Sequence, residues 1–118
     1  MLTGIGYDPV YLAAGASDLR KGIDGLAATV QISFGMDPFS PSLFVFCNKS
    51  RDRLKILRWQ NNGFWLYTRR LEEGKFEWPK DARQKTIKIK ERELGWLLEG
   101  MEITQPKAHR EVKLEAAL

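Results

Sequence analysis

The sequence predicts a single α+β domain in which a mainly antiparallel β-meander sheet packs with two helices. Three observations lead to this prediction. Residues 43–79 alternate between strand-forming runs and turn residues, apolar residues at helical spacing precede and follow that stretch, and 118 residues suit one hydrophobic core. We expect the domain to span residues 1–103, followed by a polar tail, 104–118, that is flexible or becomes ordered against a partner.

The meander begins with a strand that is apolar at every position, residues 43–47, which is typical of a central strand covered on both faces. Residues 53–59 alternate, with Leu54 and Ile56 on one face and a mixture of charged and apolar side chains on the other. Residues 60–63, Gln-Asn-Asn-Gly, predict a tight hairpin into a strand from Phe64 to Leu71. A second turn at residues 72–74 is expected to lead into a last strand, Phe76-Glu77-Trp78, which Pro79 ends.

Before the meander, residues 10–14 predict a short strand and a helix follows it. Ser17 or Asp18 is expected to cap that helix by accepting a backbone N–H bond. Gly22 and Gly25 weaken a helix, which suggests either a close backbone approach to the sheet or a partner, or simple tolerance. The apolar face of this helix is expected to contain Leu19, Ile23, Leu26, Ala27 and Val30, with Arg20, Lys21 and Asp24 in solvent.

After the meander, Thr86–Lys90 alternates and carries lysines, as edge strands often do. Residues 91–99 predict a helix whose apolar stripe is formed by Leu94, Leu97 and Leu98, and Gly100 is a typical C-terminal stop.

The composition is that of an ordinary globular protein, with 43% hydrophobic and 29% charged residues, and no apolar run approaches the roughly 20 residues of a membrane span. The N-terminus lacks the basic and apolar regions of a secretory signal. Cys47, the single cysteine, cannot form an internal disulfide and is expected to be a buried small hydrophobe. We therefore expect a cytoplasmic protein that makes no membrane contact.

Positive charge is concentrated in the middle of the chain. Residues 49–92 contain 14 basic and 6 acidic residues, a net charge of +8, whereas residues 1–48 and 93–118 each carry a net charge of −2. A nucleic-acid backbone is the natural partner for such a surface. The alternative is an ordinary solvated face. The residues predicted to bind nucleic acid are Lys49, Arg51, Arg53, Lys55, Arg58, Arg69 and Arg70.

Aromatic residues are interleaved with these cations. Trp59, Trp65 and Tyr67 are candidates for stacking on unpaired bases, and Trp78 lies nearby in the sequence. The alternative is that the aromatic residues belong to the core. Aromatic side chains on an open sheet face would equally suit a homo-oligomer.

Catalytic and metal-binding constellations are not apparent. His109 is the single histidine, which excludes a His-pair metal site and disfavours a His-dependent triad. No phosphate-binding loop occurs, and the aspartates are scattered, with Asp52 between two arginines and best explained as a turn or ion-pairing residue. We therefore predict that the protein is not an enzyme and needs no cofactor or metal.

A series of ordered blocks resembles a known family, the small accessory protein (TnpB, second open reading frame) of insertion-sequence-66 bacterial transposable elements. The resemblance runs from about Val10 to Met101. It differs from the family in having Lys90 where serine or threonine is common before the last helix. The blocks are Asp18–Leu26, Leu43–Asn48, Arg51–Leu57, Asn62–Leu66, Arg70–Glu72 and Phe76–Pro79.

The resemblance implies a protein that is encoded beside a separate transposase and assists DNA transposition without performing strand transfer. We expect it to bind DNA through the basic meander and to contact the transposase or another accessory protein of the element through its helices or tail. The alternative is an adaptor whose basic face docks on an acidic surface of the transposase without contacting nucleic acid.

Overall fold

The computed structural model describes residues 9–79 and 83–102. It contains one five-stranded mixed sheet with the strand order β4-β3-β2-β1-β5. The strands are β1 (Val10–Ala13), β2 (Leu43–Cys47), β3 (Arg53–Gln60), β4 (Gly63–Arg70) and β5 (Thr86–Ile89). β1 pairs with β2 in parallel, and every other neighbouring pair is antiparallel. This arrangement confirms the predicted α+β class and the mainly antiparallel sheet.

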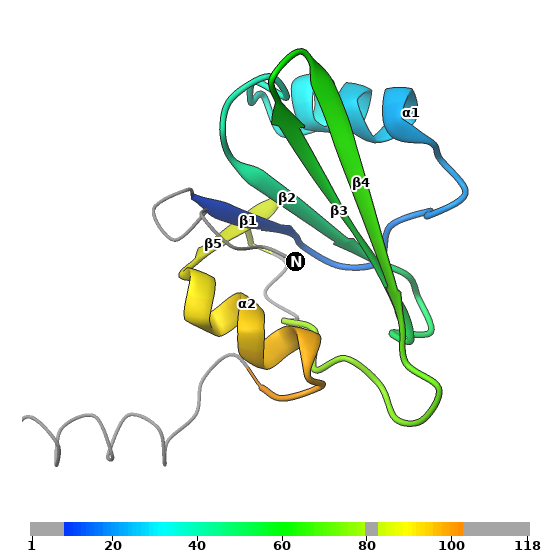
Figure 1. The fold of residues 1–118 in the computed structure, drawn as a ribbon. Coiled ribbons are helices and arrows are strands. Elements are labelled where there is room, and N and C mark those ends of the chain that lie inside the picture. Colours follow the sequence, from blue (N-terminus) through cyan, green and yellow to red (C-terminus); the bar gives the residue numbers. More distant parts are fainter. Residues whose placement is uncertain (1–8, 80–82, 103–118) are drawn as a thin grey trace, which may run out of the picture.

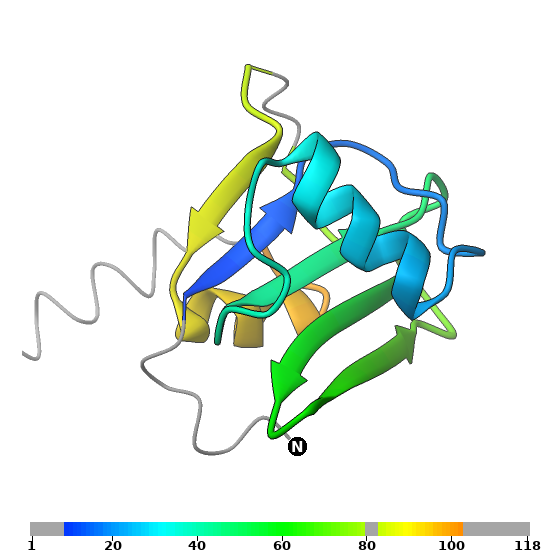
Figure 2. The same ribbon diagram turned by 90° about the horizontal axis from the view of Figure 1, so that it is seen from above.

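Helices cover both faces of the sheet (Figures 1 and 2). On one face lie α1 (Ile23–Ala28) and the π-helical turn η1 (Thr29–Ser33) that continues it, and on the other lies α2 (Glu91–Leu98). We call these the α1 face and the α2 face. β2 is buried at all five positions because it has apolar neighbours on both sides, as the sequence predicts for a central strand.

The alternation of side chains in the strands divides the core into two layers. Leu54 and Ile56 of β3 pack on the α2 face with Leu94 and Leu97 of α2. Leu57, one position out of phase, packs on the α1 face with residues of α1 and η1 that include Leu26 and Val30. The two faces of β3 are therefore those predicted from its sequence.

The hairpin between β3 and β4 is also as predicted. Asn61 and Asn62 have φ values of 48° and 71°, and Gln60 pairs with Gly63. Two central residues with positive φ form a type I′ turn, whose twist matches that of the flanking strands. Asparagine tolerates this conformation better than most residues, which explains why this turn could be recognised in the sequence.

The prediction of a strand at Phe76-Glu77-Trp78 is wrong. These residues belong to no strand, and the Trp78 N–H donates to the Phe76 carbonyl (2.9 Å), as in a γ-turn. The segment packs on the α2 face, where Phe76 is 0% and Trp78 6% exposed. The Phe76 N–H donates to the Arg51 carbonyl (2.6 Å), and the Trp78 indole N–H donates to the Ala13 carbonyl (3.0 Å). The observed alternation therefore reflects a loop that buries every second side chain against the sheet.

The start of the first helix also differs from the prediction. α1 begins at Ile23 with Gly22 as its N-cap, and no side chain caps it, so neither Ser17 nor Asp18 has the expected role. Leu19 precedes the helix, although it still packs against the α1-face core. A Cβ atom on Gly22 would meet nothing within 4 Å, and the three atoms nearest to one on Gly25 all belong to the Lys21 side chain. Neither glycine therefore allows a close approach to the sheet.

The second helix is as predicted in position and apolar stripe. Lys90 has no acceptor atom with which to cap α2, and only the reciprocal bond is made, from the Lys90 N–H to Glu93 Oε1 (2.8 Å). The C-terminus ends in a Schellman motif, in which Gly100 (φ 80°) donates to the Leu97 carbonyl and Met101 to the Trp96 carbonyl.

Gly100→Ala is expected to destabilise the domain by about 1 kcal/mol, because the left-handed conformation disfavours a Cβ atom. The nearest atoms to that Cβ, at 3.9 Å, leave room for it, so the cost lies in the backbone. Gly95→Ala, within α2 and with open space around it, is the control and should stabilise the domain by about 0.5–1 kcal/mol. Urea denaturation measures both changes in the free energy of unfolding. If both variants changed it in the same direction, the left-handed backbone at Gly100 would not explain the effect.

Candidate nucleic-acid interface

The strand topology gathers basic residues at one end of the sheet. β1 and β2 both end there because they are parallel, β3 and β5 begin there, and β4 ends there. The loop after β1, the turn between β2 and β3 and the strand ends therefore lie close together. We call this region the basic end; its cations are Arg20, Lys21, Lys49, Arg51, Arg53, Lys55, Arg69, Arg70 and Lys85.

A groove of about 590 Å³ opens at the basic end on the α1 face. The loop that follows β1 forms one wall, and β3 and β4 supply Arg53, Lys55 and Thr68, which share one face because Lys55 pairs with Thr68. Four cations and one carboxylate line it. We call it the basic groove; its lining residues are Ser17, Asp18, Leu19, Arg20, Asn48, Lys49, Arg53, Lys55 and Thr68.

The Lys55 side chain links β3 to the loop that forms one wall of the groove. Its ammonium Nζ donates to the Leu19 carbonyl at 2.8 Å, and the side chain is half-buried. An ammonium has three donors, so this bond leaves two for a ligand. Lys55 thus both positions the loop and contributes charge to the groove.

Asn48 holds the turn that presents Lys49 and Arg53. Its Oδ1 accepts from the backbone N–H groups of Asp52 (3.1 Å) and Arg53 (3.2 Å), and its Nδ2 donates to Asp52 Oδ1 (2.8 Å). Arg51 takes a φ of 61° within this turn. Asp52 is therefore a turn residue, one of the two roles predicted for it.

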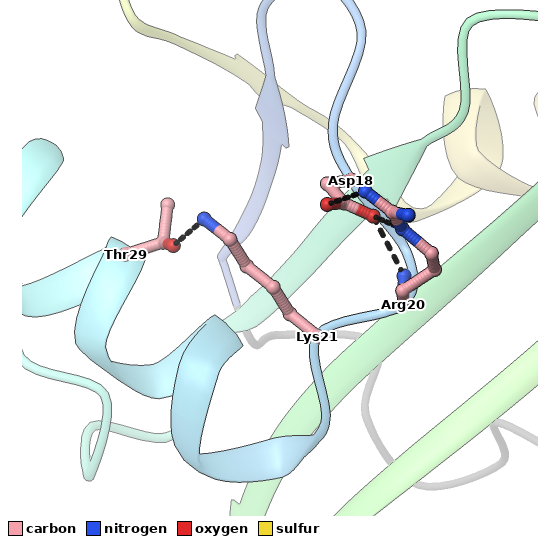
Figure 3. Close-up of polar contacts among 4 residues, drawn as sticks. All are labelled: Asp18, Arg20, Lys21 and Thr29. Carbon is pink, nitrogen blue, oxygen red and sulfur yellow. Dashed lines mark hydrogen bonds and ion pairs between the residues drawn. The ribbon is translucent and has the colours of Figure 1, made fainter.

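Asp18 and Arg20 form an exposed ion pair in the loop wall (Figure 3). Asp18 Oδ1 accepts from the backbone N–H of Arg20 (3.0 Å) and from its Nε (2.9 Å), and Oδ2 lies 2.9 Å from Nη2. These bonds to Arg20 lower the pKa of Asp18 to about 2. The carboxylate therefore stays charged at neutral pH and offsets one cation of the groove.

Lys21 borders a second hollow, of about 520 Å³, on the other side of the same loop. Its Nζ donates to the Thr29 hydroxyl at 3.4 Å, as Figure 3 shows, and Lys85 lies on the rim of the same hollow. Arg20 and Lys21 were not among the predicted site residues because the sequence suggested the solvent face of a helix. Their charge within the block Asp18–Leu26 was the available signal, and only the tertiary structure places them at the basic end.

The predicted cations do not form one surface. Lys49, Arg53 and Lys55 line the basic groove, and Arg51 lies beside it in a smaller hollow of about 220 Å³. Arg70, on the α1 face, pairs with Glu72 (2.7 Å), and Arg69, on the α2 face, donates through Nε to the Leu98 carbonyl (2.7 Å). Arg58 points to the α2 face near the opposite end of β3, since it pairs with Leu43.

The aromatic candidates are separated as well. Trp59 lies on the α1 face in a cluster with Phe39 and Phe64, each with its ring centroid 4.9 Å from that of Trp59. Trp65 and Tyr67 lie on the α2 face and stack on each other, with centroids 5.9 Å apart and planes 8° apart. Trp65 is 52% exposed, whereas Trp78 is part of the core.

Within residues 9–79 and 83–102, no group of three or more histidine, cysteine, aspartate or glutamate side chains is arranged to hold a metal ion. Cys47 is fully buried, and this burial raises the pKa of its thiol to about 12, so it is not a nucleophile at neutral pH.

Among the described helices, none is long and apolar enough to cross a bilayer. The predicted polar tail, residues 104–118, which includes His109, lies outside the described residues.

These features define a small α+β domain with a concave, positively charged site at one end of its sheet. The chain belongs to the family described as IS66 Orf2 like protein, whose model matches residues 8–108, so the predicted family is confirmed. Members of this family are accessory proteins of IS66 elements.

Two relatives from Sinorhizobium fredii (strain NBRC 101917 / NGR234) are similar over most of their length. Uncharacterized protein y4hO is 36% identical over 97 residues, which cover 82% of this chain and 84% of the relative. Uncharacterized protein y4jC is 33% identical over 98 residues, which cover 83% of each. No solved structure is significantly similar to the chain.

Proposed function

We propose that this chain is a non-catalytic accessory protein for the transposition of an insertion-sequence-66-type element and that it binds DNA through the basic groove. The observation that supports this most directly is the groove itself, because four cations from three separate segments converge on it. A DNA backbone that enters such a groove releases condensed counterions, which drives binding without reading the base sequence. The proposal includes the cytoplasmic location expected from the sequence.

The arrangement of the aromatic side chains favours double-stranded over single-stranded DNA. Binding of unpaired bases requires aromatic rings beside the cations that hold the backbone. Trp65 and Tyr67 lie on the face of the sheet opposite the groove, and Trp59 packs between Phe39 and Phe64. We therefore propose phosphate contacts by Lys49, Arg53 and Lys55, with Arg51 and Arg70 at the rim, and no base stacking in the groove.

The double variant Lys49→Glu/Arg53→Glu should reduce DNA affinity and flatten its salt dependence. Both residues are exposed, and neither side chain contacts another described residue through a hydrogen bond or ion pair, so charge reversal should leave the fold intact. Loss of two phosphate contacts lowers the slope of log affinity against log salt by about 2. Fluorescence anisotropy with labelled duplex DNA, at about 50 to 200 mM salt, measures this.

The matched control is Lys88→Glu/Lys90→Glu, which changes the net charge equally on two exposed residues at the β5 edge. It should bind DNA with nearly the wild-type salt slope. Equal effects of the two double variants would mean that net charge, not the groove, governs binding. The absence of wild-type binding at the lowest salt would contradict the DNA proposal and favour the adaptor alternative, which retention of transposase after nuclease digestion tests directly.

A further inference from the structure

The two edges of the sheet are built differently. β5 is only four residues long, and Lys88 within it and Lys85 and Lys90 beside it discourage pairing with another strand. β4 is eight residues long, contains neither lysine nor proline, and pairs with β3 in continuous register from end to end, without a bulge. Figure 2 shows β4 as the outermost strand on its side of the sheet. Apart from Arg69 and Arg70 at its C-terminal end, the β4 edge thus lacks the devices that protect the β5 edge.

Alternate residues of β4 direct their backbone groups away from β3. The two-residue turn makes Gln60 and Gly63 a hydrogen-bonded pair, and antiparallel pairs then alternate along the ladder. This alternation makes Asp52 and Leu71 a hydrogen-bonded pair, and the Leu71 N–H does donate to the Asp52 carbonyl (2.8 Å). The N–H and C=O groups that point outward belong to Phe64, Leu66, Thr68 and Arg70, and no described residue pairs with them.

Apolar side chains reach this edge on both faces of the sheet. On the α2 face, Trp65 is 52% exposed and stacks on Tyr67. On the α1 face, Phe64 and Leu66 are half-buried and pack against the core. An added strand would therefore gain main-chain hydrogen bonds and would cover apolar surface above and below them.

We propose that β4 pairs antiparallel with β4 of a second copy of this chain, about a twofold axis at Tyr67. In this register the strand overlaps its own copy from Phe64 to Arg70. Trp65 then lies across from Arg69 of the second copy on the α2 face, and Phe64 lies across from Arg70 on the α1 face. A guanidinium beside an aromatic ring is favourable through cation–π contact, so this register matches cations to rings as well as pairing main-chain hydrogen-bond groups.

Two other arrangements lack this match of arginines to aromatic rings. An axis at Leu66 would leave Arg69 opposite Gly63 and Arg70 opposite Asn62 of the hairpin turn, and parallel pairing would place the arginines beside their like-charged copies. The antiparallel arrangement joins two five-stranded sheets into one and keeps both basic grooves on the same face. The inference rests on the β4 edge and does not depend on DNA binding.

Thr68→Pro tests the interface because Thr68 is exposed and its N–H points outward. Proline removes that donor but leaves the ladder with β3 intact. Sedimentation equilibrium should give the wild-type chain twice the 13.6 kDa of one copy and should give Thr68→Pro the single mass. Thr68→Ala, which keeps the N–H, should remain a dimer. Near-UV circular dichroism checks that each variant is folded.

A cysteine at the proposed axis tests the register. The Tyr67 residues of the two copies would form a non-hydrogen-bonded pair with Cα atoms about 4.5 Å apart, within the range that a disulfide spans. Tyr67→Cys should form a covalent dimer on oxidation and Thr68→Cys should not, while the buried Cys47 remains unreactive. A monomeric wild-type chain at all concentrations, a Thr68→Pro dimer, or stronger cross-linking at position 68 than at 67 would each overturn the proposal.

Discussion

Phe76→Ala is expected to lower the free energy of unfolding by about 3–5 kcal/mol, a large part of the 5–15 kcal/mol typical of a domain. The Phe76 ring is fully buried in the α2-face core, in a cluster that also contains Trp78 and Leu94. Alanine would leave a cavity under a loop that is joined to the β2–β3 turn by the hydrogen bond from the Phe76 N–H to the Arg51 carbonyl. Chemical denaturation followed by tryptophan fluorescence measures the change.

The control for Phe76→Ala is Glu77→Ala, at the next residue of the same loop. Glu77 is exposed, so its truncation should change the free energy of unfolding by no more than about 0.5 kcal/mol. A similar, small loss for both variants would show that the segment does not close the α2 face. A large loss for both would indicate that the segment is sensitive to any change, not to the buried ring.

The β3–β4 hairpin and α2 could be predicted because local chemistry determines them. Asn61 and Asn62 adopt positive φ at a position where two strands must reverse, and Leu94 and Leu97 recur at helical spacing before Gly100. In each of these elements the apolar period and the terminating residue indicate the same structure. Tertiary contacts stabilise them but were not needed to locate them.

Phe76–Trp78 could not be assigned correctly, because a period of two describes side-chain burial and not hydrogen bonding. A loop on the surface of a sheet can bury alternate residues in the same way as a strand within it. The start of α1 was missed because Asp18 can cap a helix or form a local turn, and in the structure its carboxylate accepts from Arg20 instead. Neither choice can be made from the local pattern.

The charge pattern predicted a site but not its shape. A run of cations along one strand alternates between faces, so Arg53 and Lys55 lie on the α1 face and Arg58 on the α2 face. That division follows from strand geometry and was accessible from the sequence. The contribution of Arg20 to the basic groove was not accessible, because the β1–β2 crossover brings the loop after β1 beside β3.

Asn48→Ala is expected to lower the free energy of unfolding by about 2 kcal/mol, since three hydrogen bonds, two of them partly buried, are lost at about 0.5–1.5 kcal/mol each and water replaces part of that loss. If the groove binds DNA as proposed, the variant should also bind DNA more weakly although the net charge is unchanged. The reason is that Asn48 fixes the turn from which Lys49 and Arg53 reach the groove. Urea denaturation and duplex-DNA anisotropy on the same preparation measure the two effects.

Ser50→Ala, in the same turn, is the matched control. Ser50 is exposed, and no described residue accepts a bond from its hydroxyl, so neither stability nor DNA affinity should change. If Asn48→Ala loses stability but binds DNA with wild-type affinity, the turn is not part of the binding site, and the phosphate contacts must lie elsewhere on the basic end. Loss of affinity with an unchanged salt slope would instead show that the number of phosphate contacts is kept and that the turn contributes by pre-organising the cations that make them.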